Sequence, residues 1–217
     1  IKLGLSGKNI SYSISKNYFI TKFKNKKKKN HTYSIFDLND LAEVEQLFNT
    51  ENLNGLNVTI PFKEKIIPYL DELSDEAQKI GAVNTILIRN NIKKGFNTDA
   101  FGFEKTLMLH KKNHHHSALI LGNGGAAKAV KYIMEKQGIA YQTVSRNSEL
   151  NFENLTEEIV ANHPLIIQCT PVGTFPNIED CLDFPFAGLT SQHLIIDLIY
   201  NPDYTSFIKM ASEKGAK

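Results

Sequence analysis

The chain has 217 residues, and its 25 lysines and arginines against 23 aspartates and glutamates leave a formal charge of +2. Hydrophobic residues make up 41% and charged residues 22%, which excludes a disordered polyelectrolyte and a membrane bundle. No run approaches the ~18 apolar residues of a spanning helix, and the opening run is too short for a signal peptide. We therefore expect a cytoplasmic protein of one large or two small domains.

The first half of the chain alternates β-prone runs with segments of helical periodicity. Pro61 ends one strand because proline lacks an N–H donor, and Gly81 ends a helix. Asn90 and Asn91 predict a turn. Strands are predicted at residues 3–6, 31–36, 55–61 and 83–88, and helices at 18–23, from Asp40 onward and at 74–80.

The second half begins with Asp99, which we expect to cap a helix that carries Phe103, Leu107 and Met108 on one side. A polar connector follows at residues 111–116. Buried strands are predicted at residues 117–121, 165–169 and 194–198, a further strand at 141–144, and a helix at 126–137. Such nearly continuous apolar runs predict a parallel sheet that helices cover on both faces.

Two clusters of titratable side chains have an ordinary interpretation as solvated loops. Lys22, Lys24 and residues 26–29 would also fit a nucleic-acid patch, but no aromatic residue is interleaved in the lysine run. We expect these lysines beyond the end of the first helix. Adjacent histidines at 114–116 cannot all face one metal from a regular element, so a polar turn is expected there and no metal site is predicted.

A glycine-rich segment between a strand and a helix has the GxGxxA form of the dinucleotide-binding fingerprint, although a plain tight turn would also produce it. The tight turn lets a diphosphate approach the backbone and the amino end of the helix. Its residues are Gly122, Asn123, Gly124, Gly125, Ala126 and Ala127. We therefore expect an α/β protein of two domains: an N-terminal α/β substrate domain at residues 1–100, and a Rossmann-type doubly wound parallel sheet at 101–217.

The end of the next strand indicates the cofactor. An acidic residue there would accept from the 2′-hydroxyl of NAD, whereas this chain has Arg146. A guanidinium suits the 2′-phosphate of NADP, although a solvent-facing arginine is the plain alternative.

Lys63 and Asp99 are the candidates for proton transfer in the first domain. Both follow strands, at the edge where open α/β sheets bind ligands. Each also has an ordinary interpretation, because a lone lysine is usually solvated and a lone aspartate before a helix usually caps it.

Four motifs together resemble the shikimate dehydrogenase family. The patterns GxNVTxPxK, GAVNT, GxNTDxxG and GxGGAxxA occur in order from Gly55, Gly81, Gly95 and Gly122. Weaker counterparts of the family's NRT, NxTPxGM and DxxYNPxxT segments follow, so the resemblance spans residues 1 to about 205.

The resemblance implies a role for each matching residue. Lys63 is implied as the catalytic lysine, with Asp99 as its partner and as a ligand of a ring hydroxyl. The implied substrate contacts are Ser13 and Ser15 at the carboxylate, together with Thr59, Asn84 and Tyr200. The implied cofactor contacts are Gly122, Asn123, Gly124, Gly125, Ala126, Arg146, Thr170 and Gly173.

The chain departs from the family pattern at a few positions. Tyr12 and Lys16 replace the His and Pro that flank the two serines, and Gln168 and Thr174 replace an Asn and a Met on the nicotinamide side. The family continues beyond Lys217 through a Gly-rich turn, a substrate-binding Gln and closing helices, so a truncated carboxyl end is expected.

The implied activity is the reversible NADP-dependent reduction of 3-dehydroshikimate to shikimate in aromatic biosynthesis. The alternatives are a quinate/shikimate dehydrogenase that uses NAD and a non-catalytic dinucleotide-binding protein. We expect small-molecule partners only, with no nucleic acid and no membrane, and a monomer or a homodimer. Lys63 would act either as an acid or as an electrostatic stabiliser.

Overall fold

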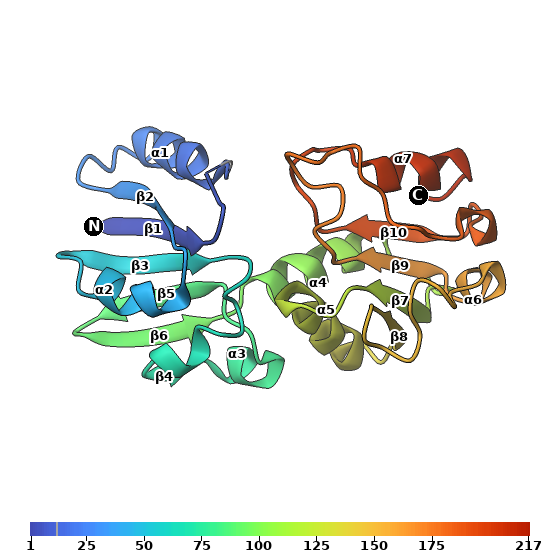
Figure 1. Cartoon of the computed structure of the whole chain (residues 1–217), viewed down its shortest axis with the longest axis horizontal. Helices are drawn as coiled ribbons and strands as arrows, with labels where there is room; N and C mark the ends of the chain where they lie inside the picture. The colour runs from blue at the N-terminus through green and yellow to red at the C-terminus, as the bar shows by residue number, and fades with distance from the viewer. Residues whose placement is uncertain (12) are drawn as a thin grey trace. The chain divides into compact units, whose positions relative to one another are not determined.

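Two β-sheets organise the chain, one in each of two units, Ile1–Asp99 and Ala100–Lys217 (Figure 1). The computed structural model describes residues 1–11 and 13–217. Tyr12, one of the departures from the family pattern, lies outside the described residues. The α/β class predicted from the sequence is confirmed. Within the described part of the chain, every helix is too short or too polar to cross a bilayer.

The sheet of the first unit is mixed, with the strand order β2-β1-β3-β5-β6-β4. The central strand β1 runs parallel to β2 and β3, whereas β5 is antiparallel to β3 and β6. Its strands are β1 (Lys2–Gly7), β2 (Thr32–Asp37), β3 (Leu53–Val58), β4 (Glu72–Leu73), β5 (Thr85–Arg89) and β6 (Ile92–Phe96). Its helical segments are α1 (Ser15–Asn25), η1 (Leu41–Glu43), α2 (Val44–Phe48), η2 (Ile67–Tyr69) and α3 (Asp75–Ile80).

Alternate residues of the first sheet face two different layers, as the period of two of a strand requires. Leu5 of β1 and Tyr33 of β2 pack with Phe19 of α1 on one face. Leu56 of β3 packs with Val44 of α2 in the core on the opposite face. Helix α1 and the shorter helices therefore cover opposite faces, and β1 and β3 lie between them.

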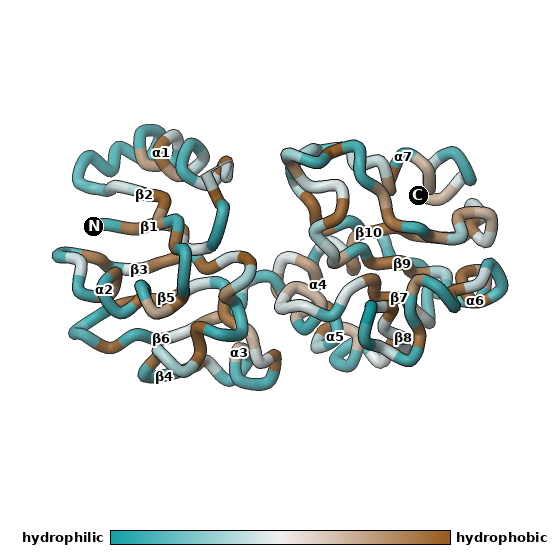
Figure 2. The backbone as a smooth tube through the Cα atoms, in the orientation of Figure 1, coloured by the Kyte–Doolittle hydropathy of each residue, from teal (hydrophilic) through white to brown (hydrophobic). Residues whose placement is uncertain are grey.

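The sheet of the second unit is parallel throughout, with the order β10-β9-β7-β8. Figure 2 shows β7, β9 and β10 as mainly hydrophobic stretches of the chain, and β7 and β9 are buried almost throughout. The strands are β7 (Ser117–Leu121), β8 (Ala140–Val144), β9 (Leu165–Gln168) and β10 (Leu194–Asp197). The helical segments are α4 (Asp99–His110), α5 (Gly125–Lys136), α6 (Glu157–Ala161), η3 (Phe186–Gly188) and α7 (Ser206–Glu213).

The strand order reverses between β7 and β9, because β8 lies on one side of β7 and β9 and β10 on the other. A doubly wound sheet binds ligands at such a reversal, outside the carboxyl ends of the two strands. The loops that follow β7 and β9 therefore lie where this fold class holds a ligand.

Three local predictions were wrong. Asp99 is the first residue of α4 and does not precede it, because its carboxylate is engaged by other side chains, as described below. Met108 is 55% exposed, whereas Phe103 and Leu107 are buried, because consecutive helix residues point about 100° apart. Lys22 and Lys24 lie inside α1, although they are exposed as expected.

The polar connector at residues 111–116 has a buried centre. His115 is only 4% exposed, and its Nδ1 accepts from the N–H of Lys112 at 3.0 Å. Its Nε2 lies 3.1 Å from the carbonyl oxygen of Gln192. Burial lowers the pKa of the His115 imidazole, because the charged form would lose its hydration.

Candidate functional site

The carboxyl ends of β1 and β3 lie together at one edge of the first sheet, because the two strands are adjacent and parallel. Beyond them, the N–H of Thr59 donates to the carbonyl of Ser6 at 2.9 Å, and the N–H of Lys8 donates to that of Ile60 at 3.1 Å. The segment that leads to α1 and the segment that leads to Lys63 therefore leave the sheet side by side.

Lys63 and Asp99 form an ion pair at this edge. Nζ of Lys63 lies 2.6 Å from Oδ2 of Asp99, and the two side chains are 17% and 32% exposed. Partial exclusion of water strengthens such a charge-assisted bond. Lys63 is thus held in place by Asp99, its predicted partner, which lies 36 residues further along the chain.

Asn84 holds the other oxygen of that carboxylate. Its Nδ2 donates to Oδ1 of Asp99 at 2.7 Å, and its Oδ1 accepts from the N–H of Thr98 at 2.9 Å. The hydroxyl of Thr85 also donates to this oxygen, at 3.0 Å. The hydroxyl of Thr98 is a third donor to this oxygen, at 3.1 Å. Because the side chain is largely buried and its oxygen takes three donors, the Asn84 amide has one preferred orientation.

Asn97 shapes the turn that delivers Asp99. It is 3% exposed, its Oδ1 accepts from the N–H of Asp99 at 3.0 Å, and its Nδ2 donates to the carbonyl of Ala82 at 3.0 Å. Asn97 was not among the predicted site residues. The available signal was three polar residues directly after a strand.

The hydrogen bonds continue across the sheet to β2. Nδ2 of Asn57 donates to Oγ1 of Thr85 at 3.2 Å, from the residue directly opposite in the ladder. The hydroxyl of Tyr33 donates to Oδ1 of Asn57 at 2.8 Å. A series of polar contacts therefore joins Tyr33 to Lys63 through Asn57, Thr85, Asn84 and Asp99.

The remaining predicted substrate contacts lie at the start of α1, directly after β3 and in the second unit. Ser13 and Ser15 are at the start of α1, where Oγ of Ser13 accepts from the N–H of Ser15 at 3.2 Å. Thr59 follows β3 directly and is half-buried. Tyr200 belongs to the second unit, is 56% exposed and follows β10.

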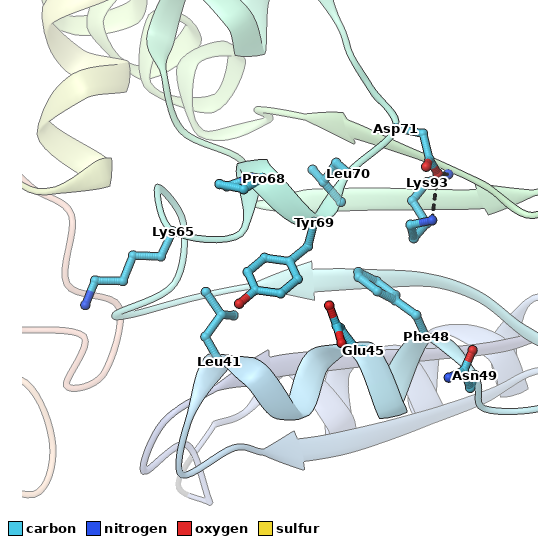
Figure 3. A pocket seen from close by; sticks show the side chains of 10 residues that line it. All are labelled: Leu41, Glu45, Phe48, Asn49, Lys65, Pro68, Tyr69, Leu70, Asp71 and Lys93. Carbon is cyan, nitrogen blue, oxygen red and sulfur yellow. Dashed lines mark hydrogen bonds and ion pairs between the residues drawn. The ribbon is translucent and has the colours of Figure 1, made fainter.

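The first unit also contains an open groove of about 940 Å³ between α2 and η2 (Figure 3). Phe48, Glu45 and Tyr69 line it, and Lys93 closes one side through a 2.8 Å ion pair with Asp71. None of the predicted site residues lines this groove. The predicted site residues therefore lie outside this groove.

The glycine-rich loop of the second unit is tightly folded on one side and open on the other. Gly122 has φ +109°, and a Cβ there would lie 3.2 Å from the backbone of Cys169, so a larger residue would strain the turn. A Cβ at Gly124 would meet no atom within 4 Å. Gly124 also precedes α5, whose first turn carries no acidic residue. This open helix start fits an anion such as a diphosphate.

A lysine two turns into α5 contacts the middle of the same loop. Nζ of Lys131 donates to Oδ1 of Asn123 at 2.6 Å, and burial lowers the pKa of this ammonium group. Lysine side chains on a helix lean towards its amino end, which explains the reach.

The loop after β9 is organised by a buried glutamine. Gln168 is fully buried, its Oε1 accepts from the N–H of Thr170 at 2.6 Å, and its Nε2 donates to the carbonyl of Val172 at 3.2 Å. Gly173 has φ +90°, and a Cβ there would lie 2.9 Å from the carbonyl oxygen of Asp180. The glutamine that replaces the family's asparagine thus fixes both sides of the loop.

Arg146 is exposed in the turn after β8. The N–H of Gly122 donates to the carbonyl of Val144 at 2.8 Å, so the arginine lies two residues beyond a direct contact with the glycine-rich loop. The hydroxyls of Ser145 and Ser148, 2.6 Å apart, close the turn that presents it.

Asp197, at the end of β10, holds the loop that carries Tyr200. Its Oδ1 accepts from the N–H of Ile199 at 3.0 Å, and its Oδ2 accepts from the hydroxyl of Thr205 at 2.7 Å. Burial raises the pKa of this carboxyl, because two hydrogen bonds do not fully replace its hydration.

Comparison with known sequences places these features in one family. A family model described as the shikimate dehydrogenase substrate binding domain matches residues 5–86. The shikimate dehydrogenase (NADP(+)) of Methanosphaera stadtmanae is 36% identical, over 83% of this chain and 71% of the relative. That of Clostridium beijerinckii is 33% identical, over 99% of this chain and 83% of the relative.

Solved structures match all of the chain. Shikimate dehydrogenase from Aquifex aeolicus superposes with a TM-score of 0.87 at 34% identity, over 84% of its own length. The Thermus thermophilus enzyme, in complex with NADP(H) and shikimate, gives 0.86 at 27% identity, over 85% of its length. Quinate dehydrogenase from Corynebacterium glutamicum, in complex with NAD, gives 0.85 at 25% identity, over 86% of its length.

Proposed function

The chain belongs to the shikimate dehydrogenase family, and on that premise we propose that it catalyses the reversible, NADP-dependent reduction of 3-dehydroshikimate to shikimate. The observation that carries the proposal is the Lys63–Asp99–Asn84 network at the carboxyl edge of the first sheet. It combines a fixed cation, a fixed acceptor and a buried amide. These groups suit a hydroxylated ring that gains a proton at one oxygen, because the cation can serve the reacting oxygen while the acceptor and the amide hold hydroxyls.

The N-terminal domain, predicted at residues 1–100, binds the substrate. Lys63 supplies a proton or positive charge to the reacting oxygen, and the Asp99 carboxylate orients Lys63 and accepts from a ring hydroxyl. Asn84 and Thr59 contact the ring, and Ser13 and Ser15 at the start of α1 hold the substrate carboxylate. The polar start of α1 supports this clamp, since a helix amino end favours an anion.

The second unit binds the dinucleotide. Its glycine-rich loop, Gly122 to Ala126, and the open start of α5 accept the diphosphate. Thr170 and Gly173, in the loop fixed by Gln168, line the nicotinamide side, and Tyr200 contacts the substrate. When bound, NADP(H) exchanges a hydride with the reacting carbon.

Arg146 supports NADP over NAD, because a guanidinium pairs with the 2′-phosphate that only NADP carries. A quinate dehydrogenase that uses NAD is the second candidate, favoured by the similarity to the Corynebacterium glutamicum structure. Arg146 in place of an acidic residue argues against it.

An absorbance assay at the nicotinamide band tests the proposal, with shikimate and quinate each paired with NADP⁺ and NAD⁺. We expect the largest kcat/KM for shikimate with NADP⁺. A larger value for quinate with NAD⁺ would favour the second candidate. Absence of turnover in all four pairings, from protein shown to be folded, would contradict both.

A further inference from the structure

We propose that Tyr33 is a positioning residue of the substrate site, joining the start of α1 to the Asn84–Asp99–Lys63 network. The inference rests on the proposed roles of those residues. Tyr33 reaches both sides of the site, because its ring contacts α1 and its hydroxyl contacts Asn57. It is buried, so neither contact competes with bulk water.

The ring of Tyr33 stacks on Phe19 of α1. The two ring centroids are 4.4 Å apart and the planes differ by 9°. Phe19 lies one turn after Ser15, the first residue of the helix. Because residues four apart lie on the same helix face, the stack fixes the part of α1 that presents the serine.

The hydroxyl of Tyr33 begins a directed series of hydrogen bonds. Its proton is donated to Oδ1 of Asn57, which leaves Nδ2 of Asn57 to donate to Thr85. The Thr85 hydroxyl, having accepted this bond, donates its own proton to Oδ1 of Asn84. Each donor thus sets the orientation of the next group.

Loss of the Tyr33 hydroxyl removes the group that selects the orientation of Asn57. The Asn57 amide then gains freedom to reverse, and a reversed amide presents its oxygen to Thr85. The Thr85 hydroxyl would donate to that oxygen, and Asn84 would lose one of the donors that hold its amide against Asp99. The substitution therefore alters the orientation of the groups proposed to bind the substrate and leaves the second unit unchanged.

The test is Tyr33→Phe, which retains the ring and removes the hydroxyl. We expect kcat/KM for shikimate to fall about tenfold, the typical effect of an unsatisfied buried partner, with KM for NADP⁺ and NADP⁺ binding unchanged. The matched control is Tyr141→Phe, which removes a 2.7 Å hydroxyl bond to Glu135 in the second unit. It should leave kcat/KM for shikimate unchanged.

A double-mutant cycle separates positioning from a general loss of stability. Thr85→Val breaks the same series at another residue, so Tyr33→Phe should add less than about twofold in its background. Phe19→Leu removes the stack but retains the hydroxyl, and should raise KM for shikimate more than it lowers kcat. Thermal unfolding of each variant verifies that the folded enzyme is being measured.

Independent effects of Tyr33→Phe and Thr85→Val on kcat/KM would overturn the proposal, as would a Tyr33→Phe enzyme with unchanged shikimate kinetics. Both results require an active wild-type enzyme. A wild-type chain that binds NADP⁺ but does not oxidise shikimate would instead contradict the proposed function.

Discussion

The amide of Asn84 donates to Oδ1 of Asp99 at 2.7 Å, so the carboxylate that holds Lys63 is itself fixed from a largely buried position. The other oxygen of Asp99 remains for the lysine, at 2.6 Å. The Asp99 carboxylate therefore binds the neutral Asn84 amide with one oxygen and the Lys63 cation with the other. Each of the two contacts can be removed separately by substitution.

Replacement of Lys63 by alanine should lower kcat by about 10²- to 10⁴-fold, the usual contribution of a positioned proton donor. KM for shikimate should change little, because the charge matters most where negative charge develops on the oxygen. Steady-state kinetics with shikimate and NADP⁺ measure both values.

Lys65→Ala is the matched control for this variant, because Lys65 is exposed and lies two residues further along the same segment. It should retain the wild-type kcat. Similar losses from the two substitutions would indicate that the segment had been disturbed and that Lys63 has no specific role.

Replacement of Arg146 by glutamine should reduce the preference for NADPH over NADH by about ten- to hundredfold in kcat/KM, as expected for one charge-assisted contact with the 2′-phosphate. Fluorescence titration with NADPH reports the same loss without turnover. Arg89, the other arginine of the chain, is exposed on β5, and Arg89→Gln should leave the preference intact. An unchanged preference in Arg146→Gln would remove the arginine from cofactor selection.

Acid should destabilise the connector around His115. Because burial lowers the pKa of this imidazole below its ordinary 6.5, the folded state disfavours the proton that the unfolded state takes up. The stabilisation is complete above the unfolded pKa and is lost as pH falls towards the folded one. Urea unfolding at a series of pH values should show a shallower acid decline for His115→Asn, which retains an acceptor for the Lys112 N–H.

His110→Asn is the control for that measurement, since His110 is exposed at the end of α4. Its unfolding free energy should follow the wild-type pH dependence. Equal pH dependence in His115→Asn and the wild type would show that His115 does not titrate on unfolding in this range.

Replacement of Thr205 by valine should lower the unfolding free energy by about 1–3 kcal/mol at neutral pH, because the partly buried Asp197 loses a donor and α7 loses its N-cap. Burial raises the pKa of the Asp197 carboxyl above its ordinary 3.8, so its contribution to stability is lost as pH rises through that window. Without the Thr205 hydroxyl, ionised Asp197 has one donor fewer, so more stability is lost as pH rises. The difference between valine and wild type should therefore be larger at neutral pH than in acid.

Thr205→Ser retains the hydroxyl and should restore most of the stability lost in the valine variant. Chemical unfolding of the three proteins side by side measures this. A serine variant as unstable as the valine variant would attribute the effect to the lost methyl group.

Signals that depend on neighbours in the sequence predicted element boundaries well. Asp40 and Glu43 form a reciprocal capping box at the start of the first short helical segment. Ser74 caps α3, and Gly81 ends that helix in the left-handed conformation at φ +69°. Such contacts span three or four residues, so a local pattern contains all the information they need.

Contacts between distant strands were not predictable in the same way. Strand β6 carries Lys93 and Lys94 with little hydrophobic alternation, because both lysines pair with acids, Asp71 and Glu72, in a neighbouring segment. The antiparallel hairpin that β6 forms with β5 was therefore not expected, although the turn at Asn90 was.

In the candidate site, too, the residues could be predicted from local motifs, but the contacts between distant strands could not. Motifs identified Lys63, Asp99 and Asn84 as residues, and the structure shows that they contact one another. Asn57 lies in the GxNVTxPxK motif but was assigned no role, and Tyr33 lies in none of the motifs. Their hydrogen bond passes over β1, which lies between their strands, and only the sheet order brings them together.

The bond between Lys131 and Asn123 has a consequence for the entropy of cofactor binding. Glycine-rich loops lose much conformational freedom when they close on a ligand, and this loss opposes binding. In this chain the exposed middle of the loop is already tethered to a helix. Part of that freedom is therefore lost on folding, so less conformational entropy remains to be lost when a dinucleotide binds.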